Sequence, residues 1–153
     1  MLIIFDSLKE LQFRKLAQIY GYSLRKEEDF YEYLRCGFFR TKGALYCVWQ
    51  EQECYLSALR LEPFGDGLIL AGLETAPAYR RKGYATALVH EVLSWLARKG
   101  PVKVYSHIQH RNAPSLEVHR RCGFRKISDY SVLLDGTVSA DIGTYLYIMS
   151  TSL

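Results

Sequence analysis

Three adjacent cations, Arg80, Arg81 and Lys82, precede Gly83 at the point where an apolar pattern typical of a helix begins. The positive end of a helix dipole disfavours cations, whereas the free backbone N–H groups at that end bind anions. Gly83 allows the backbone to approach such an anion closely because it carries no side chain. The pattern therefore predicts a phosphate or pyrophosphate site, and the alternative is a solvated basic turn.

The common phosphate-binding motifs are absent, since the sequence contains neither G-x-x-x-x-G-K-[ST] nor G-x-G-x-x-G. These absences argue against a P-loop and against a Rossmann dinucleotide site. The G-x-S-x-G elbow of hydrolases is absent as well. A second patterned segment, "NAPSLEVHRRCGF" over 112–124, directly follows a predicted strand.

Together, the two segments resemble the GNAT acetyltransferase superfamily. The stretch "RRKGYA" fits the R/Q-x-x-G-x-G/A acetyl-CoA motif of that family at Arg80, Gly83 and Ala85, and "LETAP" fits the strand end before it. The second segment fits the family pattern N-x-x-[AS]-x-x-[LV]-Y-x-x-x-G-F at Asn112, Ser115, Val118, Cys122, Gly123 and Phe124. Both motifs follow the order and spacing of the family.

The resemblance implies that acetyl-CoA lies in a cleft between the strand that ends at Thr75 and the strand over 102–108. Backbone groups of 73–76 would pair with the pantetheine arm, and backbone N–H groups over 80–85 would hold the pyrophosphate. The three cations would then be neutralised by phosphates, including the phosphate on the ribose. The residues that the resemblance assigns to the cofactor are Leu73, Glu74, Thr75, Ala76, Arg80, Arg81, Lys82, Gly83, Tyr84, Ala85, Thr86, Asn112, Ser115 and His119.

His119 stands where the family usually carries a tyrosine, which is thought to protonate the departing CoA thiolate. An imidazolium, with a reference pKa near ~6.5, is a stronger acid than a phenol near ~10. His119 would therefore serve as the catalytic acid with an optimum displaced toward lower pH. The alternative is that His119 only donates a hydrogen bond to the thioester or packs in the core.

Direct attack by an amine also requires a proton acceptor. Glu74 lies at the strand end where the resemblance puts the acetyl group, and burial there would raise its pKa toward a useful range. Alternatively, Glu74 points to the far face and pairs with an arginine, because a bulge in this strand would re-aim its side chain. His107, Tyr145 and Tyr147 are rival proton acceptors that would act directly or through water.

The stretch "YGYSLRKEEDFYEYLRCGFF" is rich in aromatic residues, and the resemblance places this region at the wall of the acceptor site. Its tyrosines Tyr20, Tyr22, Tyr31 and Tyr33 would line a pocket that favours a flat or cationic amine. Packing against the sheet is the alternative for most of these rings.

Hydrophobic periodicity predicts the elements that position these residues. Strands are expected over 2–7, 44–50, 54–62, 68–75, 102–108, 127–134 and 144–149, and helices over 7–20, 26–36, 83–99 and 113–122. Ser7 and Glu10 would form a capping box at the first helix. This order predicts an α/β fold over one domain, 1–153, in which a GNAT-like mixed, mostly antiparallel sheet of about seven strands carries helices on both faces.

The 153 residues include 20 basic and 16 acidic side chains, which give a net charge of +4, and 49% are hydrophobic. This composition is typical of a soluble globular protein and does not by itself indicate nucleic acid as a partner. No apolar run is long enough to cross a bilayer and the first residues lack a signal-peptide pattern, so we expect a cytoplasmic monomer or homodimer. The four cysteines form no C-x-x-C pair and are expected to be reduced, and no metal site is expected.

These patterns predict an acetyl-CoA-dependent N-acetyltransferase. It would move the acetyl group to a primary amine of a small molecule or peptide by direct attack in a ternary complex. The alternative is a non-catalytic acetyl-CoA-binding regulatory module, because His119 replaces the tyrosine of the family. A basic nucleic-acid binder ranks last, since the aromatic motifs of common RNA readers are not visible.

Overall fold

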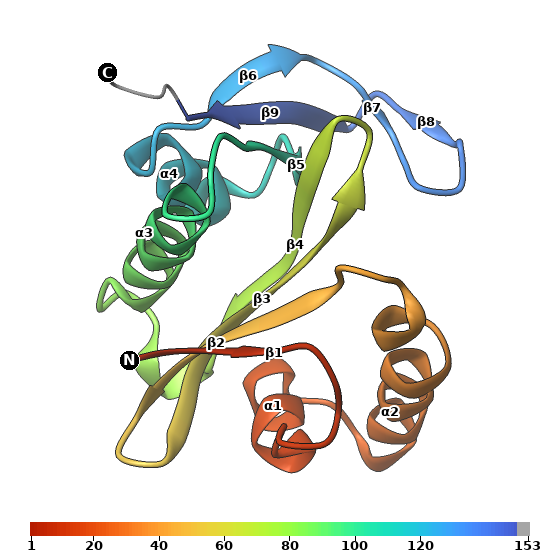
Figure 1. The fold of residues 1–153 in the computed structure, drawn as a ribbon, viewed down its shortest axis with the longest axis vertical. Coiled ribbons are helices and arrows are strands. Elements are labelled where there is room, and N and C mark those ends of the chain that lie inside the picture. Colours follow the sequence, from red (N-terminus) through yellow and green to blue (C-terminus); the bar gives the residue numbers. More distant parts are fainter. Residues whose placement is uncertain (150–153) are drawn as a thin grey trace.

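The computed structural model describes residues 1–149 and contains one seven-stranded sheet in the order β1-β2-β3-β4-β5-β9-β6 (Figure 1). All neighbouring strands are antiparallel except β4 and β5, which are parallel. The strands of this sheet are β1 (Leu2–Phe5), β2 (Leu45–Glu51), β3 (Cys54–Phe64), β4 (Gly67–Thr75), β5 (Lys103–Gln109), β6 (Arg125–Ser128) and β9 (Ile142–Ile148). A separate hairpin pairs β7 (Ser131–Val132) with β8 (Val138–Ser139).

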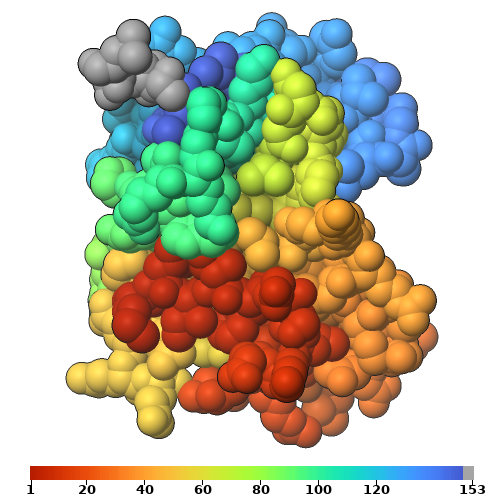
Figure 2. Space-filling view, viewed as in Figure 1, coloured from red at the N-terminus to blue at the C-terminus, as the bar shows by residue number. Residues whose placement is uncertain are grey.

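Helices cover both faces of the sheet, which confirms the predicted fold class. The helices are α1 (Phe13–Tyr20), α2 (Leu24–Cys36), α3 (Tyr84–Ala97) and α4 (Ala113–Arg121), with 3-10 turns η1 (Phe38–Arg40) and η2 (Pro77–Tyr79). Side chains alternate along β2, so that Tyr46 and Val48 join the core beneath α1 and α2 while Cys47 joins the core beneath α3. The space-filling view shows the green α3 segment directly above the red N-terminal segment that includes β1 (Figure 2).

The central parallel pair is short. Strands β4 and β5 pair only where Leu68–Leu70 meets Val104–Ser106, and the pairing stops before β4 reaches its end at Thr75. On its other edge, β4 carries a bulge, because Ala58 and Arg60 of β3 face Glu74 and Ala71. Gly72 lies in this bulge with φ +62°, a conformation that side-chain-bearing residues rarely adopt. The second half of β4 is therefore free of a strand partner on the β5 side.

The predicted capping box at Ser7 is wrong. The first helix begins at Phe13 after Gln12, which makes no side-chain cap, and 6–10 form bends between β1 and α1. The Ser7 hydroxyl accepts a hydrogen bond from the N–H of Lys9 at 3.3 Å, so it stabilises a local turn rather than a helix start. The second helix starts slightly earlier than predicted, and the Ser23 hydroxyl caps it.

The single strand predicted over 127–134 is also wrong. Strand β6 ends at Ser128, whose hydroxyl accepts a hydrogen bond from the N–H of Tyr130 at 3.2 Å and supports a turn. The chain then forms the β7–β8 hairpin around Asp135 and Gly136, where the Asp135 carboxylate accepts from the N–H of Thr137 at 2.8 Å. The Asp135–Gly136 turn thus joins two short strands outside the main sheet.

Candidate active site

The start of α3 presents free backbone N–H groups to the surface. Its first intrahelical hydrogen bond runs from the N–H of Ala87 to the Gly83 carbonyl, and no side chain caps the end. Arg81 and Gly83 have positive φ values of +64° and +86°, and this alternation curls successive N–H groups toward one side. Within 1–149, the N–H groups of 81–86 donate no hydrogen bond to the protein, so they are available to an anion.

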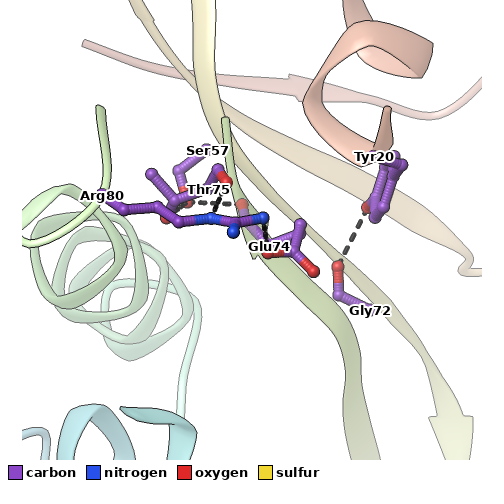
Figure 3. A network of polar contacts seen from close by, with 6 residues as sticks. All are labelled: Tyr20, Ser57, Gly72, Glu74, Thr75 and Arg80. Carbon is purple, nitrogen blue, oxygen red and sulfur yellow. Dashed lines mark hydrogen bonds and ion pairs between the residues drawn. The ribbon is translucent and has the colours of Figure 1, made fainter. Parts of the chain in front are cut away.

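The side chains of the three cations lie in different places. The Arg80 guanidinium donates to the Thr75 carbonyl at 3.0 Å and contacts the Glu74 carboxylate at 3.2 Å, which ties the loop to the end of β4 (Figure 3). The Lys82 ammonium lies 5.7 Å from the centre of the Tyr79 ring. Arg81 is exposed. Arg81 and Lys82 therefore remain beside the open helix start, whereas Arg80 is engaged with β4.

Glu74 faces the side of the sheet that carries α1 and α2, because it is the cross-strand partner of Ala58 in that core. Its carboxylate is ion-paired with Arg80, and the two side chains are 41% and 53% exposed. This ion pair corresponds to the predicted alternative for Glu74, in which its carboxylate pairs with an arginine.

His119 is buried at the point where β4 and β5 separate, with 1% of its surface exposed. Its Nδ1 lies 2.7 Å from the Ser115 carbonyl, which can only accept, so Nδ1 carries the proton. Its Nε2 lies 3.0 Å from the hydroxyl of Ser106, the last residue of β5 that pairs with β4. Burial lowers the pKa of His119, and the Ser115 hydrogen bond opposes this only in part. The ring is therefore neutral near pH 7.

The motif residues before His119 build the helix that carries it. The Asn112 side chain accepts from the N–H of Ser115 at 3.2 Å and caps α4, and the ring of Phe124 packs against His119 with centroids 4.8 Å apart. Ser106 is the residue of this cluster that sequence reasoning missed. Its signal was a polar position inside the strand pattern "VKVYSHI".

The rival proton acceptors lie on opposite faces of the sheet. Tyr145 and Tyr147 pack into the core of α3 and α4. His107 alternates with Ser106 along β5, so it faces the side of Glu74. Its ring packs edge-on to Phe64 at 5.4 Å, and burial lowers its pKa, so it is neutral and carries a lone pair near pH 7.

The four tyrosines of the aromatic stretch do not form one wall. The Tyr20 hydroxyl donates to the Gly72 carbonyl at 2.9 Å and also contacts the Tyr46 hydroxyl (Figure 3). Tyr22 stacks on Tyr20 with centroids 5.3 Å apart. Tyr31 instead packs on Phe13, away from the bulge. The structure thus brings Tyr20, and Tyr22 behind it, to the β4 bulge.

Arg60, which lies at the β4 bulge, is a second residue that the sequence analysis did not identify. It lies on the α1–α2 side of β3 between its cross-strand partners Tyr46 and Ala71, and its guanidinium is 5.6 Å from the Tyr33 ring. A charged residue inside the apolar run "CYLSALRLE" was the available signal.

Among 1–149, no group of three or more histidine, cysteine or acidic side chains is arranged to hold a metal ion. Within the same range, no helix combines the length and apolarity needed to span a membrane. All four cysteines are free; Cys47 and Cys122 are buried, and Cys36 and Cys54 are exposed.

A mixed sheet that splits between two parallel strands, beside a helix start with free N–H groups, is a fold suited to an extended anionic ligand. The sequence profile of the acetyltransferase (GNAT) family matches residues 7–124. The chain therefore belongs to the GNAT acetyltransferase family, and it is a transferase of that family. A relative by sequence is streptothricin acetyltransferase of Streptomyces lavendulae, 26% identical over 83 residues. The match spans 54% of this chain and 44% of that protein.

Solved structures share the fold over nearly the whole chain. The ribosomal-protein-S18-alanine N-acetyltransferase of Escherichia coli has a TM-score of 0.70 and 17% identity, and the match covers 99% of this chain and 96% of that one. The N-acetyltransferase PseH of Campylobacter jejuni, in complex with acetyl coenzyme A, has a TM-score of 0.71 and 12% identity, with 98% and 100% covered. PaiA of Thermoplasma acidophilum, in complex with coenzyme A, has a TM-score of 0.66 and 14% identity, with 97% and 99% covered. At these identities, the likeness is one of fold.

Proposed function

We propose that this protein is an acetyl-CoA-dependent N-acetyltransferase that transfers the acetyl group to a primary amine by direct attack in a ternary complex. The observation that carries the proposal is the early end of the β4–β5 pairing at Leu70 and Ser106, next to the uncapped start of α3. Such a split leaves β4 with free backbone groups for an extended ligand, and the helix start offers N–H groups for its phosphates. Solved relatives of the same fold are complexes with coenzyme A or acetyl coenzyme A.

In this proposal, the cofactor is held mainly by backbone. Residues 73–76 would pair with the pantetheine arm, and the N–H groups of 81–86 would hold the pyrophosphate. Arg81 and Lys82 supply charge there, while Arg80 keeps the loop docked on Thr75. Asn112 acts through α4, which carries His119, because its side chain caps this helix by accepting from the N–H of Ser115.

The transfer needs a proton acceptor on the side from which the amine approaches. The amine nitrogen bonds to the thioester carbon, the C–S bond breaks, and the amine loses a proton as CoA departs as thiolate. Glu74 and His107 both face this side of the sheet. We assign the acceptor role to Glu74, with its Arg80 ion pair exchanging for the incoming ammonium, and keep neutral His107 as the rival base.

His119 would assist the departing thiolate from the other side once its Nε2 takes up a proton, because the neutral ring carries its proton on Nδ1 and can only accept at Nε2. Its Nε2 contacts the Ser106 hydroxyl where the strands separate, so the two side chains form a hydrogen-bonded pair at the expected position of the sulfur. A thiolate is a competent leaving group, so this assistance is worth less than in reactions with poorer leaving groups.

The second candidate function is a non-catalytic module that binds acetyl-CoA. The ion pair between Glu74 and Arg80 and the burial of His119 favour it, because both candidate catalytic groups are engaged inside the protein. Both candidates predict binding of acetyl-CoA, and only the enzyme predicts release of free thiol when an amine is added.

The deciding experiment measures thiol release from acetyl-CoA against a panel of small-molecule and peptide amines, with calorimetric binding of acetyl-CoA in parallel. Thiol release with at least one amine supports the enzyme. Binding without release for every amine supports the module. Failure of acetyl-CoA to bind would refute both.

A further inference from the structure

The Arg60 guanidinium lies directly against the backbone of the β4 bulge. A Cβ atom placed on Gly72 would be 2.7 Å from Nη1 and 2.8 Å from Cζ of Arg60, so any side chain at 72 would collide with the guanidinium. The Gly72 carbonyl accepts from Tyr20 on the α1 side (Figure 3). Arg60 therefore occupies the α1–α2 side of the bulge, which is the side that Glu74 and His107 also face.

Within the described residues, 1–149, this guanidinium has no acidic partner. None of the ion pairs of 1–149 includes Arg60, although Glu62 lies two residues further along the same face of β3. Its Nε atom is buried and makes no hydrogen bond within that range. Buried arginine and lysine side chains are usually paired with a carboxylate or make several hydrogen bonds. Arg60 is thus a cation with unused hydrogen-bonding capacity at the proposed site.

The neighbours of Arg60 are neutral aromatic residues. Burial, with further contributions from Tyr46, raises the pKa of Tyr20 well above its usual value, and burial raises the pKa of Tyr46 to about 12. Neither hydroxyl is therefore ionised near pH 7, and neither supplies a negative charge. The Tyr33 ring contributes only a cation–π contact at 5.6 Å. These rings shape the surroundings of the guanidinium without neutralising it.

We propose that Arg60 binds a carboxylate on the amine acceptor, so that the preferred acceptors are amines carrying a carboxylate a few bonds from the reacting nitrogen. This inference rests on the proposed acetyl transfer at the same bulge. The planar fork of arginine matches a carboxylate with two parallel hydrogen bonds, and the partial exposure of Arg60 leaves it reachable. The short separation follows because Arg60 touches Gly72, one residue before the backbone proposed to meet the acyl end of the cofactor.

The competing explanation is structural, in which Arg60 only packs the tyrosines and the bulge. The two explanations differ in one respect. A packing role affects all acceptors equally, whereas a carboxylate-binding role affects only acceptors that have the carboxylate.

The experiment compares kcat/KM for glycine, β-alanine and alanylglycine with that for the carboxamide of each, with rates corrected for the fraction of unprotonated amine. We expect the wild type to prefer the acids by on the order of ten- to a hundredfold. Arg60→Gln should abolish this preference while leaving the carboxamide rates within about threefold, and Arg60→Lys should restore part of it. The matched control is Arg35→Gln, since Arg35 is an exposed arginine of α2 paired with Glu32.

A second measurement does not depend on turnover. N-acetylglycine and N-acetylglycinamide are titrated by calorimetry into the CoA-bound wild type, Arg60→Gln and Arg35→Gln proteins. Arg60-dependent selectivity for the acid, in either measurement, supports the proposal. Equal treatment of acid and carboxamide by the wild type, or selectivity that survives in Arg60→Gln, overturns it.

Acetyl transfer and carboxylate binding by Arg60 can be tested separately. If no amine releases thiol, the proposed acetyl transfer is wrong, and the calorimetric titration alone then decides whether Arg60 binds carboxylates. If amines release thiol without any acid preference, the acetyl transfer stands and only the role of Arg60 is wrong.

Discussion

Helices α3 and α4 flank the split between β4 and β5, but they begin in opposite ways. Helix α4 starts at a capped end, where the Asn112 side chain takes up the N–H of Ser115. Helix α3 starts at Gly83 with no side-chain cap, and its first N–H groups point away from the protein. The difference is that the cap fixes the start of the helix that carries the buried His119, whereas the N–H groups at the start of α3 have no hydrogen-bond partner within 1–149.

The largest effect is expected for a substitution that blocks the uncapped start of α3. Gly83→Glu introduces a side chain and a negative charge beside the proposed pyrophosphate, and should weaken acetyl-CoA by on the order of a hundredfold or more, as measured by calorimetry. Gly136→Glu is the matched control, because Gly136 has φ +85° against +86° for Gly83 and both have open space around them. Both variants lose similar backbone stability, about 1–2 kcal/mol, from the positive φ. Unchanged acetyl-CoA affinity in Gly83→Glu would show that the pyrophosphate does not bind at this end of α3.

The next largest effect is expected on kcat when His119, which α4 carries, is replaced. His119→Ala should lower kcat by on the order of ten- to a hundredfold with little change in acetyl-CoA affinity, because a group that acts on the developing thiolate stabilises the transition state more than the ground state. His119→Tyr should restore part of the rate and move the pH optimum upward, since a phenol keeps its proton to higher pH. Full kcat in the alanine variant across the pH range would reduce His119 to a packing residue.

The buried histidine also predicts how stability responds to pH. Burial lowers the folded-state pKa of His119, so the unfolded chain binds a proton more readily than the folded chain. The stability contributed by this site is therefore present above the unfolded pKa near ~6.5 and is lost as the pH falls below it. The free energy of unfolding of the wild type should fall relative to His119→Tyr between roughly pH 7 and pH 5, by at most about 1.4 kcal/mol per pH unit. The same pH dependence of the free energy of unfolding in both proteins over this range would contradict the lowered pKa of His119.

A smaller effect separates the cations at the open end. Arg81→Ala or Lys82→Ala should weaken CoA more than dephospho-CoA, by roughly three- to tenfold, because a nearby cation meets the ribose phosphate that only CoA carries. Arg80→Ala should weaken both ligands alike, since its guanidinium contacts the Thr75 carbonyl and the Glu74 carboxylate. Calorimetry with both ligands tests this, and equal losses on both ligands for all three variants would assign the cations another purpose.

The smallest effect is expected at the capped end. Asn112→Ala should lower the free energy of unfolding by about 1 kcal/mol, the usual value of a side-chain cap, and change acetyl-CoA affinity by less than about twofold. Ser23→Ala removes the cap of α2, which accepts from the N–H of Lys26 at 3.4 Å, and provides the comparison. A loss of acetyl-CoA affinity in Asn112→Ala beyond that in Ser23→Ala would show that Asn112 contacts the cofactor directly.

The uncapped start of α3 could be predicted from sequence because it depends on backbone. A free helix start that admits an anion needs glycine and a basic surrounding, and both are visible in "RRKGYA". The positive φ of Arg81 could not be predicted, since an arginine gives no local signal for that conformation. The fold class was predicted for a similar reason, because strand and helix periods are properties of the chain itself.

The surroundings of Arg60 could not be predicted because they depend on side chains that meet only in three dimensions. Arg60 acquires its surroundings from Tyr20, Tyr33 and Tyr46, which come from α1, α2 and β2, and nothing in the strand pattern names them. The capping box at Ser7 failed for a related reason. Its sequence pattern is local, but the hydroxyl stabilises a turn that leads the chain from β1 to the core residue Leu11.

The short parallel pairing of β4 with β5 has a mechanical consequence. Strands β1 to β4 and strands β5, β9 and β6 are joined within the sheet through only three pairs of facing residues, which makes this junction a natural hinge for opening of the sheet. A ligand bound between the two strands would oppose this opening of the sheet. Cofactor at a hundred times its dissociation constant would add about 2.7 kcal/mol to the free energy of unfolding. The slowest-exchanging amides of β4 would then extend past Leu70, so that hydrogen exchange follows the cofactor concentration.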